Sequence, residues 1–115
     1  MLSDPAAGAL RDIAHHIELA QEFTRPLSFE RLLDDTRTVY AVTRCLEIIS
    51  EASRRIPGEV KALYPFINWH GMAEAANLFR HPYEDISARL VWDTVQVALP
   101  PLRDAVAREL RKIER

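Results

Sequence analysis

The chain has 115 residues, with 15 lysines and arginines against 17 aspartates and glutamates, and 48% of its residues are apolar. A chain of this length can bury a core of its own, and a single cysteine excludes an internal disulfide and fits a reducing compartment. The net charge of −2 argues against a general DNA coat or a polybasic membrane anchor. No apolar run reaches bilayer length, and the N-terminus lacks the pattern of a secretory signal. We therefore expect one cytoplasmic domain over residues 1–115, without a membrane contact.

The N-terminal segment has the pattern of a helix that begins at Asp4-Pro5 and closes at Thr24-Arg25-Pro26. Proline suits the first helical position, because the N–H that it lacks would be unpaired there. Apolar residues then recur at helical spacing along one face of this segment, at Leu10, Ile13, Ile17 and Ala20.

The window between Pro26 and Pro57 contains neither proline nor glycine, and its apolar residues form one stripe at helical spacing. Ser28 is the expected N-cap, and Glu30 is favourable in the first turn because it complements the helix dipole. The window therefore predicts one long helix that ends at Pro57-Gly58.

The rest of the chain predicts a short helix over residues 59–64, a helix over residues 69–80 and a helical segment from Ser87 onward. Pro100 and Pro101 must kink or split this last segment, because proline cannot donate the backbone hydrogen bond that a helix interior needs. No stretch alternates with a period of two, so no strand is expected. The sequence predicts an all-α bundle of about five helices.

Several polar or reactive residues have a simple interpretation. His15 and His16 are adjacent, so on a helix their side chains point about 100° apart and cannot chelate one metal together. Cys45 lies beside the apolar stripe and is interpreted as a packing residue, and Asp35 as a surface charge. Paired cysteines and the common metal-binding motifs are absent from the sequence, so we predict neither a metal site nor a cofactor.

The end of the expected helix over residues 69–80 is crowded with the polar side chains of Asn77, Arg80, His81 and Tyr83. Asn77 and His81 are one turn apart on a helix, and Arg80 neighbours their face. A histidine at the negative end of a helix dipole favours its protonated form, and an arginine beside it can hold a phosphate. The alternative interpretation is a helix C-cap, since polar residues commonly end helices.

Five segments, in this order, resemble the HepT family of HEPN-domain proteins, the toxin half of a bacterial toxin–antitoxin pair. They are Leu10-Arg11-Asp12-Ile13, Cys45-Leu46-Glu47-Ile48-Ile49-Ser50-Glu51-Ala52, Tyr64-Pro65-Phe66-Ile67-Asn68-Trp69, His81-Pro82-Tyr83, and Val91-Trp92 with Leu99-Pro100-Pro101-Leu102. The resemblance implies a HEPN-like helical bundle that forms a symmetric homodimer. The polar motifs of the two copies would face each other across a cleft and cleave RNA without a metal.

The family motif is an arginine, four residues, a histidine, one residue and a tyrosine. The chain keeps His81 and Tyr83, but Ala76 occupies the arginine position. The resemblance implies that His81 is the general acid or base, and we hypothesise that Arg80, one turn after Ala76, partly replaces the missing guanidinium. The alternative is a catalytically degenerate module that binds a nucleotidyltransferase without turnover. A ligand-binding bundle unrelated to toxins is disfavoured by the resemblance alone.

The resemblance also implies a partner and a modification. In HepT systems the antitoxin is a small nucleotidyltransferase that attaches AMP to the motif tyrosine, here Tyr83, and the added negative charge beside His81 would block the cleft. Otherwise Tyr83 is a partly buried aromatic residue with a bonded hydroxyl. The three glycines are isolated, so the nucleotide chemistry must come from the partner. Glu51, in the matched stretch, either supports the site together with Asn77 or faces solvent.

Overall fold

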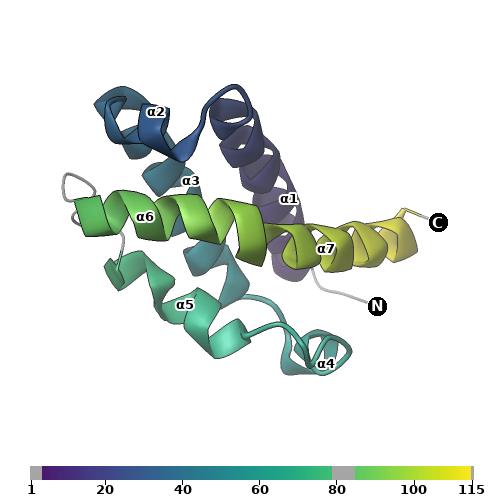
Figure 1. Cartoon of the computed structure of the whole chain (residues 1–115). Coiled ribbons are helices and arrows are strands. Elements are labelled where there is room, and N and C mark those ends of the chain that lie inside the picture. The colour runs from purple at the N-terminus through teal and green to yellow at the C-terminus, as the bar shows by residue number, and fades with distance from the viewer. Residues whose placement is uncertain (1–3, 79–84, 115) are drawn as a thin grey trace.

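The computed structural model describes residues 4–78 and 85–114, and every regular element within them is helical (Figure 1). The elements are α1 (Asp4–Thr24), α2 (Phe29–Leu33), α3 (Thr36–Ser53), α4 (Gly58–Lys61), α5 (Trp69–Leu78), α6 (Asp85–Asp93), a π-helical turn η1 (Thr94–Ala98) and α7 (Leu99–Ile113). In this described part, α1, α3, α5, α6 and α7 are the longer helices, while α2 and α4 are single turns. The expected all-α bundle of about five helices is confirmed.

Helix α1 has the bounds expected from the sequence. Its last residue, Thr24, is buried, and its hydroxyl donates a hydrogen bond of 2.9 Å to the carbonyl of Ala20. Pro26 follows two residues later and supplies no N–H with which the helix could continue. The apolar face of α1 is turned inward, with Leu10, Ile13 and Ile17 at most 2% exposed.

The prediction of one long helix between Pro26 and Pro57 is wrong, because the chain divides there into α2 and α3. Ser28 caps the first of these helices, as expected, and its Oγ accepts a hydrogen bond of 3.2 Å from the N–H of Arg31. Leu32 in α2 is fully buried, and α2 contacts α6 as well as α3. The break therefore turns α2 toward a helix that comes much later in the chain.

Asp35, interpreted from the sequence as a surface charge, is half-buried and also has a structural role, because it is the N-cap of α3. Its Oδ1 accepts the backbone N–H of Thr38 at 3.0 Å, and its Oδ2 accepts the hydroxyl of Thr38 at 2.8 Å. These hydrogen bonds, the backbone one first, lower the pKa of Asp35 below its ordinary value. A side-chain acceptor at this position satisfies an N–H that has no partner inside the helix.

The short helix expected over residues 59–64 is observed as α4, and the helix expected over residues 69–80 is observed as α5 as far as Leu78. Residues 79–84 lie outside the described residues. The last segment begins at Asp85 rather than Ser87, and its interruption before the proline pair is the π-helical turn η1 rather than a break in the helix. In the π turn the N–H of Leu99 donates to the carbonyl of Thr94, five residues earlier.

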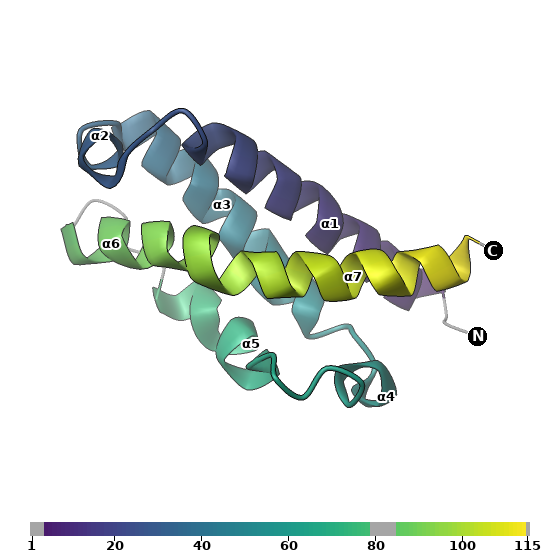
Figure 2. The same cartoon turned by 45° about the vertical axis from the view of Figure 1, so that its right-hand side comes forward.

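The core is one apolar cluster to which α1, α3, α4, α6, η1 and α7 contribute. Helix α3 contacts α1, α2, α5 and α6, and Leu46 and Ile49 on it are at most 1% exposed. Figure 2 shows α6, η1 and α7 as one rod in front of α3, with α1 on one side of the rod and α5 on the other. Cys45 is 4% exposed within this cluster, which confirms its packing role, and burial raises the pKa of its thiol.

Candidate functional site

The predicted motif falls on the chain between α5 and α6. Arg80, His81 and Tyr83 lie outside the described residues, so their roles stay predictions. The described end of α5 and the described start of α6 lie at the same end of the molecule in both ribbon views (Figures 1 and 2). The backbones of Ala76 and Asn77 belong to the last turns of α5, and their side chains are outside the description.

The start of α5 is held by two side chains. Asn68 accepts the backbone N–H of Gly71 through its Oδ1 at 2.9 Å, and a Cβ added to Gly71 would lie 2.5 Å from the Nδ2 of Asn68. The indole N–H of Trp69 donates to the carbonyls of Lys61 and Tyr64, at 3.1 and 3.2 Å. These contacts tie α5 to the α4 segment, so the direction of α5 is set where the helix begins.

Further along, α5 is attached to α3 through the carbonyl of Ala73. The Ser50 hydroxyl donates to this oxygen at 3.0 Å, and the Arg54 guanidinium donates to it through Nε at 3.1 Å and through Nη2 at 2.6 Å. We call these three residues the Ala73 clasp. The clasp lies one turn before Ala76 and Asn77, so it fixes α5 against α3 close to the predicted site.

Sequence reasoning missed the clasp, and the only signal for it was the spacing of Ser50 and Arg54. Residues four apart lie on the same face of a helix, so both side chains of α3 can reach one atom of a neighbouring helix. The identity of that atom, a backbone carbonyl of α5, has no signature in the sequence.

Glu51, predicted as a supporting residue, is exposed on α3. Among the described residues, no hydrogen bond or ion pair joins its carboxylate to a side chain. A supporting Glu51 would have to contact Asn77, Arg80 or His81, and the side chains of these three residues lie outside the description. The supporting role of Glu51 and Asn77 therefore stays a prediction.

The two adjacent histidines belong to α1. His15 is exposed, and Nδ1 of the half-buried His16 lies 2.7 Å from the backbone carbonyl of Asp12. Within residues 4–78 and 85–114, histidine, cysteine and carboxylate side chains form no group of three that could hold a metal. Over the same residues, no helix combines the length and apolar character that crossing a bilayer requires.

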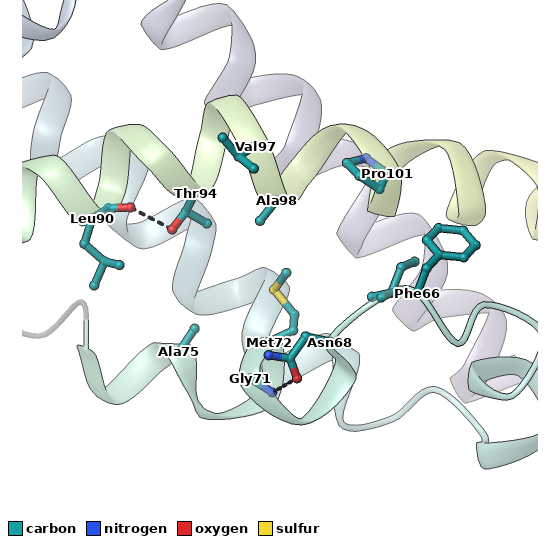
Figure 3. Close-up of a pocket in the computed structure, with 11 residues that line it drawn as sticks. Phe66, Asn68, Gly71, Met72, Ala75, Leu90, Thr94, Val97, Ala98 and Pro101 are labelled. Carbon is teal, nitrogen blue, oxygen red and sulfur yellow. Dashed lines mark hydrogen bonds between the residues drawn. The ribbon is translucent and has the colours of Figure 1, made fainter.

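An apolar pocket of about 410 Å³ lies between α5 and the α6–η1 region (Figure 3). Met72 and Ala75 line it from α5, and Leu90 lines it from α6. Phe66 and Val97 also line it, although each is 72% exposed. Its lining residues are Phe66, Ile67, Asn68, Gly71, Met72, Ala75, Leu90, Thr94, Val97, Ala98 and Pro101.

A second polar cluster links the segment before α5 to α7. The Tyr64 hydroxyl donates to Oε2 of Glu109 at 2.6 Å, and the Lys112 ammonium donates to the same oxygen at 2.7 Å. Burial alone would raise the pKa of Glu109, but the hydrogen bonds from Lys112 and Tyr64 outweigh it and lower the pKa. Burial, together with the hydrogen bond to Glu109, raises the pKa of Tyr64.

The fold and the polar residues between α5 and α6 define a small all-α domain of the kind that the HepT resemblance implies. Residues 13–109 match the family described as ribonuclease HepT-like, so the chain belongs to this family of ribonucleases and the resemblance is confirmed. The chain is 46% identical over 94 residues to the "Probable ribonuclease HepT" of Thermococcus cleftensis, covering 82% of this chain and 86% of that protein.

Two further relatives come from Methanocaldococcus jannaschii. "Putative RNase MJ0127" is 34% identical, with 79% of this chain and 75% of that protein covered. "Putative RNase MJ1216" is 29% identical, with 91% and 87% covered. No solved structure matches the chain significantly.

Proposed function

We propose that this chain is a metal-independent endoribonuclease that acts as the toxin of a HepT/MntA toxin–antitoxin pair. Its membership of the HepT-like ribonuclease family over residues 13–109 carries the proposal. Relatives that match most of the chain carry ribonuclease names, which supports RNA as the substrate. The catalytic residues of the proposal are Arg80 and His81, in the connection between α5 and α6.

The chemistry that suits these residues is acid–base cleavage of an RNA phosphodiester. The 2′-hydroxyl attacks the adjacent phosphorus, so that the O2′–P bond forms and the P–O5′ bond breaks. His81 takes the proton of the 2′-hydroxyl or delivers a proton to the departing O5′, and its counterpart in a second copy of the chain performs the other transfer. Arg80 stabilises the negative charge that develops on the phosphate oxygens. The product ends are a 2′,3′-cyclic phosphate and a 5′-hydroxyl.

The test is cleavage of a labelled RNA by the purified chain in the presence of EDTA. We expect His81→Ala to slow cleavage by about 10²–10⁴-fold, because it removes the proton-transfer group. Arg80→Ala should abolish cleavage if Arg80 has taken over the arginine role. His70→Ala is the matched control, because His70 is an exposed histidine of α5 and should be dispensable. Equal cleavage by the wild type and the His81→Ala variant would exclude the proposed site.

The homodimer belongs to the same proposal, because the proposed cleavage uses two copies of His81 and each chain supplies only one. Light scattering after size exclusion should give twice the mass of one chain at the concentrations at which cleavage occurs. A monomer that cleaves RNA at full rate would contradict the shared cleft.

A degenerate binding module is the second candidate, and Ala76 at the arginine position of the motif is the observation that favours it. This candidate predicts that the chain binds its nucleotidyltransferase but neither cleaves RNA nor arrests growth. Expression of the wild type beside the His81→Ala variant separates the two functions, since growth arrest by the wild type alone requires turnover.

Regulation of the proposed toxin would act on Tyr83. Co-expression with a neighbouring nucleotidyltransferase should add AMP to this tyrosine, which mass spectrometry detects on the peptide that contains it. The Tyr83→Phe variant should carry no adduct. An unmodified Tyr83 in an inactive complex would show that the antitoxin acts by binding alone.

A further inference from the structure

Helix α5 leads into the proposed site but contributes no cation of its own. Its sequence from Trp69 to Leu78 contains neither lysine nor arginine, and its one charged residue is Glu74. A ribonuclease must hold a polyanion, and the negative net charge of this chain offers no general attraction. The positive charge along this helix therefore has to come from another element.

Arg54, at the C-terminal end of α3, brings a guanidinium to α5. Two of its nitrogens donate to the carbonyl of Ala73, Nε at 3.1 Å and Nη2 at 2.6 Å. A carbonyl in an α-helix points toward the residue four positions later, so the guanidinium lies beside the turn that runs from Ala73 to Asn77. It is thus held next to the last described turns of α5.

The guanidinium of Arg54 keeps binding capacity after these two contacts. The side chain is exposed, and its Nη1 has no hydrogen-bond partner among the described residues. In the same part of the chain, no carboxylate forms an ion pair with it. An arginine has five N–H donors in a rigid fork that suits phosphate oxygens, so Arg54 can hold the Ala73 carbonyl and an anion together.

We propose that Arg54 is a phosphate-binding residue for the RNA substrate, which it contacts through the free side of its guanidinium while the other side stays on Ala73. The inference rests on the proposed ribonuclease function. The hydrogen bonds to Ala73 hold the side chain in place before RNA arrives, which reduces the entropy lost on binding. A second guanidinium at this turn would assist Arg80 in a chain that has Ala76 at the arginine position.

Arg55 is the matched control, because it is the next residue, is also exposed and carries the same charge. Its guanidinium lies 3.2 Å from Oδ2 of Asp12 and so is directed to α1 rather than to α5. Replacing either arginine with glutamine changes the net charge equally, so any difference between the two variants reports the position of the guanidinium.

The experiment measures binding of a fluorescent single-stranded RNA to the full chain in a His81→Ala background, which prevents cleavage, at several KCl concentrations. Loss of one phosphate contact should reduce the slope of log K against log salt by about 0.7. We expect this reduction and a several-fold weaker affinity for Arg54→Gln. Arg55→Gln should keep the parent slope, and Arg54→Lys should keep it too, because lysine retains the charge.

Ser50→Ala distinguishes phosphate binding from a purely structural role. This change loosens the Ala73 clasp without removing a charge, so it should leave the salt slope unchanged. Weaker binding with an unchanged slope in both Ser50→Ala and Arg54→Gln would show that Arg54 only holds α5, and would overturn the proposal. Thermal melting of each variant confirms folding, and Arg54→Ala replaces Arg54→Gln if the latter does not fold.

The outcomes also separate this inference from the ribonuclease proposal. Equal affinities and slopes for the parent and Arg54→Gln, with RNA cleavage intact in the wild type, would overturn the role of Arg54 alone. A chain that neither binds nor cleaves RNA at any salt concentration would overturn both. A reduced slope in Arg54→Gln together with normal binding by Arg55→Gln would support the inference.

Discussion

At the scale of single residues, Glu109 shows how a charge is accommodated in the core. It is 4% exposed, and a carboxylate buried to this extent is stable only when it is paired. Tyr64 and Lys112 both donate to it, and these charge-assisted hydrogen bonds stabilise the ionised form. The same cluster holds the chain before α5 against α7, so a polar contact helps to set the position of the helix that leads to the proposed site.

This cluster predicts a pH dependence of stability. The pKa of Glu109 is lower in the folded chain than its ordinary value of 4.5, so the unfolded chain binds this proton more readily. The stabilisation by Glu109 is therefore complete above pH 4.5 and is lost as the pH falls through the lower, folded-state pKa. Between pH 6 and pH 3, Tm should fall more steeply for the wild type than for Glu109→Gln.

Thermal unfolding followed by circular dichroism at a series of pH values checks this prediction. Asp104→Asn is the control, because Asp104 is an exposed carboxylate on the same helix and should leave the pH profile of the wild type unchanged. Parallel profiles for the wild type and Glu109→Gln would mean that the buried carboxylate does not titrate differently in the two states.

At the scale of elements, the boundary between α2 and α3 shows how capping divides a continuous apolar pattern. Apolar residues keep the same helical spacing before and after Asp34 and Asp35, and this spacing predicted one helix. The chain instead turns at these residues, with the Asp35 carboxylate as acceptor for the N–H of Thr38. Leu32 is thereby buried in a helix that contacts α6.

We predict that Asp35→Ala lowers Tm, because the first turn of α3 loses its side-chain acceptor. Asp35→Asn should retain most of the stability, since the amide oxygen can accept the same N–H. Asp34→Ala is the neighbouring control, because Asp34 is exposed and its side chain caps no helix. Differential scanning fluorimetry of the three variants measures the effect, and an equal Tm for Asp34→Ala and Asp35→Ala would contradict it.

At the scale of the whole molecule, one apolar cluster joins helices from both ends of the chain. Ile49 of α3 belongs to this cluster and is fully buried, and the two tryptophans, Trp69 and Trp92, lie on α5 and α6. A single core of this kind unfolds cooperatively in small domains. We therefore propose that residues 1–115 behave as one domain.

Ile49→Ala should lower the free energy of unfolding by about 2–5 kcal/mol, because it leaves a cavity in this core. Urea unfolding is followed by tryptophan fluorescence and by circular dichroism. In each protein, wild type or variant, the transitions that the two probes report should coincide. Val97→Ala, at an exposed position of η1, should change the stability far less. Two separate transitions would show that part of the chain folds independently.

The sequence by itself determined the helical class, the end of α1 at Thr24 and the interruption of the last helix before Pro100, because helical periodicity and the missing N–H of proline act locally along the chain. The motif segments also sufficed to find the family. The tertiary structure alone decided that Arg54 holds Ala73 and that Tyr64 meets Glu109, 45 residues away. These contacts depend on which helices pack together, and no local pattern specifies the partner of a side chain that crosses between them.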